Sequence, residues 1–224
     1  MNAAARIVCC ALVALASSGV FAQSVGRTEI KDLPDGWVTL VTYDMKGLSL
    51  DSGTSHIPMQ ASVFLNKSRD MLMVVESTVG GHGKNVNWMT MKCPPVRAGY
   101  FTNDYGSNTK NLDTRCLVVN TRYSDKKYLE GISPQVAGAV EKENLKFDKG
   151  HLIRAWSGIR GGTYLKVYLF KTSAFKTEST AGKEEASGVD QSLVAFGESL
   201  QKAVYDSTLS LGGGLSLQLL NTIK

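Results

Sequence analysis

The sheet of this protein is encoded most clearly between Asp70 and Asn120, by the segments DMLMVVESTV (70–79), GGHGKN (80–85), VNWMTMKC (86–93) and DTRCLVVN (113–120). We predict three strands, and the glycine-rich segment is expected to join the first two as a hairpin. The first strand has apolar residues on both faces along its first half, which is typical of a central strand covered on two sides. The chain therefore contains a sheet with this strand in its interior.

Two cysteines, Cys93 and Cys116, are the only ones after the first ten residues, and we interpret them as one disulfide that staples the sheet. Closing a loop of this length stabilises a fold by about 3 kcal/mol. Free thiols are one alternative, and another makes Cys93 a nucleophile with His82 or His151 as its base. A metal site would use the same histidines, but the sequence has neither CxxC nor HxxxH spacing. No metal is predicted.

Residues 1–22 have the pattern of a secretory signal peptide. Arg6 gives a short positive segment, Ile7–Ala16 is apolar, and Val20–Ala22 is a small-residue cleavage site, so we expect the mature chain to begin at Gln23. The apolar run is too short to span a bilayer, and no later stretch approaches the required run of about 18 apolar residues. We therefore predict an exported chain, periplasmic or secreted, without a transmembrane span.

Further strands are predicted on both sides of the central segment from alternation and β-branched content. They are Trp37–Tyr43, Lys46–Leu50, Ala61–Asn66, His151–Trp156 and Thr163–Lys171. The first two are expected to pair across a connection at Asp44 and Met45, and the last two are expected to form a hairpin. Gln23–Leu33 is polar and patternless, which predicts a loose lead-in.

Two helices are predicted. The first begins at Ser133 and Pro134, a cap followed by a proline at the first helical position. The clearest helix is Gly188–Ser207, whose apolar stripe consists of Val189, Leu193, Phe196, Leu200 and Val204. The polar segment 176–188 before it is expected to be a surface loop, and Leu215–Ile223 a last short strand.

Runs of strands followed by a helix favour a segregated α+β fold over an alternating α/β one. We therefore predict that residues 23–224 form one α+β domain, with a mainly antiparallel sheet of about seven or eight strands and the C-terminal amphipathic helix packed on it. A closed β-barrel with a terminal helix is the alternative.

The sequence contains no recognisable catalytic motif. It has no Gly-x-Ser-x-Gly elbow and no His-Glu-x-x-His helix. The segment 80–85 resembles a phosphate-binding loop, but Thr78 stands where that motif needs its first glycine, and Asn85 stands where it needs Ser or Thr. We predict no cofactor, and the sequence favours a protein without enzymatic activity.

Basic and aromatic residues are concentrated between Arg97 and Tyr128, where six basic residues stand against three aspartates. Such a mixture can form a surface for anionic sugars or lipid headgroups, whereas a net charge of +5 for the whole chain is too small to indicate a nucleic-acid binder. The candidate binding residues are Arg97, Tyr100, Tyr105, Lys110, Arg122, Tyr123, Lys126 and Lys127. The disulfide would hold the two loops that carry them together, and two solvated loops are the simpler interpretation.

These patterns favour a non-enzymatic binding or structural protein of the cell envelope, in contact with anionic envelope polysaccharide or lipid headgroups. The rival hypothesis is a small-ligand carrier or hydrolase whose pocket is built from residues distant in sequence. A deep pocket lined by two or more titratable groups would favour the rival, and a shallow surface with a basic rim would favour binding.

Overall fold

A computed structural model describes nine parts of the chain, residues 23–49, 56–80, 93–95, 99–106, 113–145, 149–159, 163–172, 191–210 and 213–223. Its main sheet contains β3 (Val38–Ser49), β4 (His56–Asn66), β5 (Met71–Thr78), β6 (Tyr100–Asp104), β7 (Thr114–Asp125), β8 (Lys149–Gly158) and β9 (Tyr164–Lys171). These seven strands lie in the order β3-β4-β5-β9-β8-β7-β6, and every neighbouring pair is antiparallel. The sheet is open rather than a closed barrel, and the predicted α+β class is confirmed.

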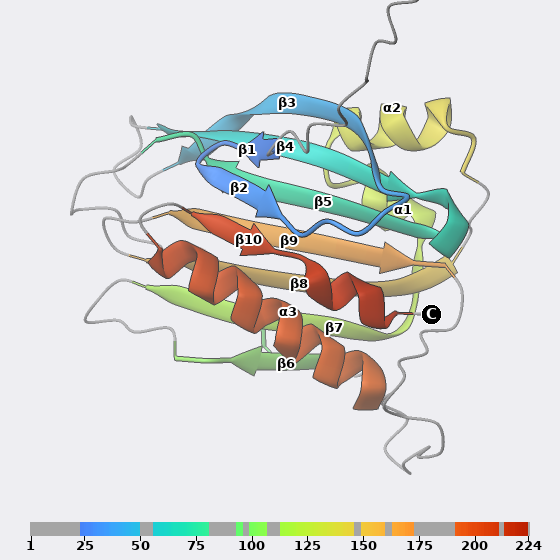
Figure 1. The fold of residues 1–224 in the computed structure, drawn as a ribbon. Helices are drawn as coiled ribbons and strands as arrows, with labels where there is room; N and C mark the ends of the chain where they lie inside the picture. The colour runs from blue at the N-terminus through green and yellow to red at the C-terminus, as the bar shows by residue number, and fades with distance from the viewer. Residues whose placement is uncertain are drawn as a thin grey trace, which may run out of the picture.

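The sheet consists of two antiparallel meanders, β3-β4-β5 and β6-β7-β8-β9, which meet where β5 pairs with β9 (Figure 1). All eight residues of β5 are buried, as the apolar residues on both of its faces predict. From β5 in the interior the chain passes to β6 at the far edge. The predicted hairpin of β8 and β9 is confirmed.

One face of the sheet is covered by α3 (Gln191–Leu209), which crosses β7, β8 and β9 in Figure 1. The part of the predicted stripe that the structure describes, Leu193, Phe196, Leu200 and Val204, is buried in one core cluster with residues of these strands. A Cβ at Gly197 would lie 2.9 Å from a methyl carbon of Val119, so the glycine permits close approach of helix and sheet.

A small sheet lies beside α3 on the same face (Figure 1). It consists of β1 (Gln23–Val25), β2 (Thr28–Lys31) and β10 (Gly214–Ser216), with β2 in the middle, antiparallel to β1 and parallel to β10. The prediction of a loose lead-in over 23–33 is therefore wrong. The sequence of residues 23–33 shows no clear strand alternation, because β1 and β2 are very short and the chain turns between them at Gly26, whose φ is +54°.

Two short helices lie against the opposite face of the sheet, α1 (Lys126–Glu130) and α2 (Pro134–Lys142). The predicted start of α2 is confirmed, because the Ser133 Oγ accepts a hydrogen bond from the Val136 N–H at 3.1 Å. Val136, Ala139 and Val140 are buried in a second core cluster with apolar residues of β4, β5, β8 and β9. None of the described helices is long and apolar enough to cross a bilayer.

Three further elements differ from the predictions. Residues 38–49 form one strand without a hairpin at Asp44 and Met45, because both halves of β3 pair with β4 and register shifts absorb the irregularity. The predicted loop after Cys93 contains β6, which pairs with β7. In the tail, β10 ends at Ser216 and is followed by a 3-10 helix at Gln218–Thr222, while another 3-10 helix lies at Lys67–Arg69.

Some predicted segments lie outside the described residues. They are the signal peptide at 1–22, most of the strand at 86–93 and the polar loop at 176–188.

Candidate functional site

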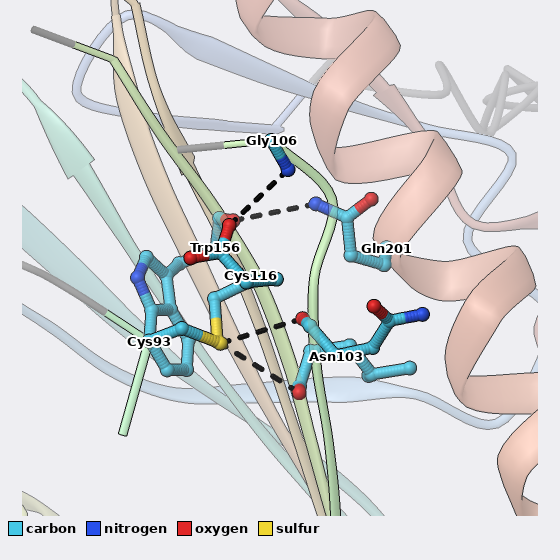
Figure 2. Close-up of a disulfide and its surroundings, with 8 residues drawn as sticks. Cys93, Asn103, Gly106, Cys116, Trp156 and Gln201 are labelled. Atoms are coloured by element: carbon cyan, nitrogen blue, oxygen red, sulfur yellow. Dashed lines mark hydrogen bonds between the residues drawn. A yellow bond between two sulfur atoms is a disulfide. The ribbon is translucent and has the colours of Figure 1, made fainter. Parts of the chain in front are cut away.

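The predicted disulfide between Cys93 and Cys116 is present, with the two Cα atoms 5.3 Å apart and 23 positions apart in sequence. Cys116 is fully buried in β7, opposite Trp156 of β8. Figure 2 shows the pair beside Trp156 and Asn103, with the Cys93 Sγ 3.3 Å from the Asn103 carbonyl oxygen. Since both sulfurs are bonded, Cys93 is not available as a nucleophilic thiolate.

A polar cluster lies on the sheet face opposite α3. Its members are Tyr43 of β3, Glu76 of β5, Arg154 of β8, Lys166 and Tyr168 of β9, and Tyr128 of α1. The strand register brings them together, because Glu76 lies opposite Lys166, and Arg154 lies opposite Tyr168. Residues that face each other across an antiparallel ladder project from the same side of the sheet. We call this group the Glu76 cluster.

Glu76 is only 5% exposed. Burial raises the pKa of this carboxyl above its ordinary value, and the nearby Lys166 ammonium and the polar interaction with Tyr168 oppose that shift. Burial likewise lowers the pKa of Lys166, with Glu76 opposing the shift and Arg154 adding to it. The sheet thus holds interacting charged groups in a largely water-excluded place, as functional sites often do.

We expect Glu76→Gln to change how stability depends on pH. Because the folded protein holds the Glu76 proton more tightly than the unfolded chain, the wild type should lose stability relative to the variant as pH rises above the ordinary value of 4.5. Denaturant unfolding of both proteins at several values from about pH 4 to about pH 7 measures this difference. The matched control is Glu141→Gln, which removes an exposed carboxylate of α2. A wild-type advantage that grows with pH would contradict the prediction.

Both cations of the cluster pack against aromatic rings. The Arg154 Nη1 donates a hydrogen bond to the Tyr128 hydroxyl at 2.7 Å, and its guanidinium carbon lies 5.5 Å from the centroid of that ring. The Lys166 Nζ lies 4.5 Å from the ring centroid of Tyr168 and 5.5 Å from that of Trp156. Cation–π contacts of this kind are worth about 0.5–1 kcal/mol where they are exposed and more where they are desolvated.

Tyr100, a predicted binding residue, lies on the same face as this cluster. It stands opposite Asn120 in the β6–β7 ladder, while its neighbour Phe101 packs into the core under α3. Tyr100 and Tyr128 are 37% and 38% exposed. Burial is the main cause of the raised pKa of Tyr128, and interaction with Tyr100 also raises it, so the two rings are electrostatic neighbours. Lys127 is exposed on α1 beside Tyr128.

Tyr105, also a predicted binding residue, lies on the α3 side of the sheet. Its hydroxyl donates a hydrogen bond to the Glu198 Oε1 at 3.2 Å. The Arg115 guanidinium lies 5.0 Å from the Tyr105 ring centroid and 3.9 Å from that of Tyr205, and its Nε donates to Gln201 at 3.0 Å. These contacts attach α3 to β7 and to the end of β6.

The other predicted binding residues are not placed. Arg97 and Lys110 lie outside the described residues, as do the side chains of Arg122, Tyr123 and Lys126. The structure therefore brings Tyr100 and Lys127 to the face of the Glu76 cluster and separates Tyr105 from them. A binding role for the eight residues stays a prediction.

A shallow cavity of about 270 Å³ lies between β3 and α2. No member of the Glu76 cluster lines it; the lining residues are Leu40, Val41, Gln135, Gly138, Ala139, Lys142 and Glu143. This volume is just below the range of about 300–1,000 Å³ that is usual for ligand pockets. The two titratable residues of the cavity are Lys142 and Glu143, and Glu143 is already paired with Lys67 at 2.7 Å. The cavity is shallow, so it is not the deep pocket that would favour a carrier or hydrolase.

The sequence predictions missed the core of the cluster, although the sequence carries a signal for it. Glu76, Arg154 and Lys166 are single charged residues inside otherwise apolar segments, MLMVVEST, HLIRAW and YLKVYLF. A charge in a buried strand is costly unless it has a partner. Three such charges in strands predicted to share a sheet would have indicated a common site.

No match was found when the chain was compared with protein-family models, with curated proteins and with solved structures. The structural class of the chain is therefore described from its own fold and side-chain arrangement. It is an α+β protein with an open antiparallel sheet, a disulfide near one edge, and a cluster of charges and tyrosines on the face away from α3.

Proposed function

We propose that this protein is an exported, non-enzymatic binding protein of the cell envelope that contacts anionic polysaccharide. The observation that carries the proposal is the pair of exposed tyrosines, Tyr100 and Tyr128, next to the guanidinium of Arg154. Tyrosine and arginine are enriched in binding interfaces and among the residues that dominate binding energy. Flat rings supply contact area, and the cation selects a ligand of negative charge.

The exposure of these rings supports a role in binding rather than in packing. The exposed large apolar side chains of the described residues are Val38, Val79, Tyr100, Tyr128 and Leu209. Two of the five are the neighbouring tyrosines, while the three aliphatic ones belong to other segments of the chain. The surface beside Arg154 thus offers aromatic rings and cations rather than aliphatic side chains that would enter a lipid phase, which favours a saccharide over a membrane.

Export is supported by two separate features of the chain. The disulfide is of a kind that persists in oxidising compartments and is rare in the cytosol. Residues 1–22 carry the charge and apolar pattern of a secretory signal. A periplasmic or secreted protein meets the anionic envelope polymers that the proposed surface would bind.

We expect the mature protein to be retained on an immobilised anionic polysaccharide and to pass through a neutral one. Retention should fall as salt rises, because the screening length shortens to about 8 Å at 0.15 M. The double variant Tyr100→Ala/Tyr128→Ala should weaken binding about tenfold or more, since tyrosine is enriched among the few interface residues whose truncation costs over about 1 kcal/mol. Reversal of charge at Arg122, Lys126 and Lys127 should abolish retention, and a triple variant that binds as well as the wild type would show that these loops are solvated surface.

The matched control is Lys202→Ala, which removes an exposed α3 cation on the opposite face and should leave retention unchanged. Retention on anionic liposomes alone would identify lipid headgroups as the target and contradict the polysaccharide. Equal binding by the tyrosine variant and the wild type, or no binding by either at low salt, would show that the surface has no such role.

A further inference from the structure

The described face of the sheet carries two neighbouring cations that lack an acidic ion-pair partner, and this arrangement identifies a more specific site. Arg154 of β8 lies opposite Tyr168, and Lys166 stands two positions before Tyr168 on β9. The two basic residues are therefore diagonal neighbours on one face of adjacent strands, a separation that long side chains bridge. Both side chains are partly buried.

We propose that Arg154, Lys166 and the Tyr128 hydroxyl form a subsite for a single oxyanion group, a carboxylate or a phosphate. The inference rests on the proposed function, because this group would be the charged substituent of the polysaccharide. Arginine and lysine together are well suited to such a group, since a planar guanidinium can donate two parallel hydrogen bonds and an ammonium adds a compact charge.

The first argument is the lack of ion pairing. Within the described parts of the chain, the ion pairs are Lys31–Glu29, Lys67–Glu143 and Lys202–Asp206, so neither Arg154 nor Lys166 takes part in one. Glu76 is the nearby acid, and it lies opposite Lys166 in the β5–β9 ladder. Its carboxylate is buried and interacts electrostatically with Lys166, but within the described residues it forms no ion pair with either cation.

The second argument concerns hydrogen-bond donors. A guanidinium has five N–H donors, and in the described residues the hydrogen bond of the Arg154 side chain is the one to the Tyr128 hydroxyl. That hydroxyl accepts from Arg154, so its own proton is directed elsewhere. The remaining Arg154 N–H groups, the Tyr128 hydroxyl and the Lys166 ammonium can therefore all donate hydrogen bonds to one anion on this face.

The third argument is electrostatic. Two like charges partly shielded from water repel each other, and Arg154 lowers the pKa of Lys166, after the larger effects of burial, which also lowers it, and of Glu76, which raises it. An anion between them would remove the repulsion and gain charge-assisted hydrogen bonds. Arg115 on the other face differs from Arg154. Its guanidinium packs against Tyr105 and Tyr205 and donates a hydrogen bond to Gln201, so its role is to attach α3 to the sheet.

The subsite is tested with small probes and backbone-assigned NMR titrations of the mature protein. Glucuronate supplies a sugar carboxylate, inorganic phosphate supplies the alternative anion, and glucose is the neutral control. We expect glucuronate or phosphate to shift signals of Arg154, Lys166 and Tyr128, with saturation in the millimolar range, and glucose to shift none. The stronger of the two anions identifies the charged group.

Arg154→Gln and Lys166→Gln should each weaken binding of the anion about tenfold or more, and Arg154→Lys should recover only part of it because the planar fork is lost. Lys202→Gln, on the α3 face, should bind as the wild type does. If a variant does not fold, the wild-type titration alone decides, because anion-dependent shifts confined to other elements contradict the subsite. Polysaccharide retention with no anion response at these residues would overturn the subsite and leave the proposed function standing.

Discussion

Replacing both Cys93 and Cys116 by serine should lower the free energy of unfolding by about 2–4 kcal/mol. The bond closes a chain segment of 23 positions, and the unfolded chain gains freedom when that constraint is removed. Cys116 is also fully buried beside Trp156, so a serine hydroxyl there would enter an apolar cluster. Denaturant unfolding of the oxidised wild type and the double variant measures the difference.

The double variant Cys93→Ala/Cys116→Ala separates the two causes, because alanine removes the bond without burying a hydroxyl. Reduction of the wild type should reproduce most of the alanine result. The loss should also be greatest at β6, which lies at the edge of the described sheet and pairs there with β7, so its amides should exchange fastest in either variant. Two freely alkylated thiols in the native, air-exposed wild type would contradict the prediction.

The parts of the fold that the sequence predicts are those where local pattern and tertiary burial agree. In 70–79 the apolar residues on both faces predict a central strand, and β5 is buried along its whole length. The stripe from Leu193 to Val204 has the helical period, and its residues face the sheet. The Ser133 cap likewise fixes the start of α2 by a local hydrogen bond.

The missed elements depend on contacts that no local pattern contains. The strands β1 and β2 exist because β2 pairs with β10 from the other end of the chain, and because the Thr28 hydroxyl bonds to that of Ser77 at 2.8 Å. The sequence of β3 predicts two strands instead of one, because the alternation of its side chains is interrupted where the register with β4 shifts. Non-local pairing of this kind cannot be read from a window of a few residues.

The candidate site was predicted only in part, because it too depends on non-local contacts. The concentration of basic and aromatic residues in 97–128 predicts a binding surface there, and Tyr100 lies on the face that carries the Glu76 cluster. Tyr105 lies five positions later, an odd offset along an extended chain, and it packs toward α3, where its hydroxyl donates a hydrogen bond to Glu198. Arg154 and Lys166 join Tyr100 only through the order of the strands, which the sequence did not predict.

Truncating Leu200 to alanine should cost about 2–5 kcal/mol of the free energy of unfolding, because the side chain is fully buried between α3 and the sheet and its removal leaves a cavity. Leu209→Ala is the matched control on the same helix, since Leu209 is 57% exposed and its loss should change stability by less than about 0.5 kcal/mol.

Chemical denaturation of the three proteins gives both values, and anion titration under native conditions adds a second comparison. Leu200 lies on the face opposite Arg154, so a Leu200→Ala protein that is still folded should bind the anion as the wild type does. Equal stability of Leu200→Ala and Leu209→Ala would mean that α3 does not hold the sheet. A folded Leu200→Ala protein that no longer binds would mean that both faces act as one unit, because the α3 face would then control the cations on the other side.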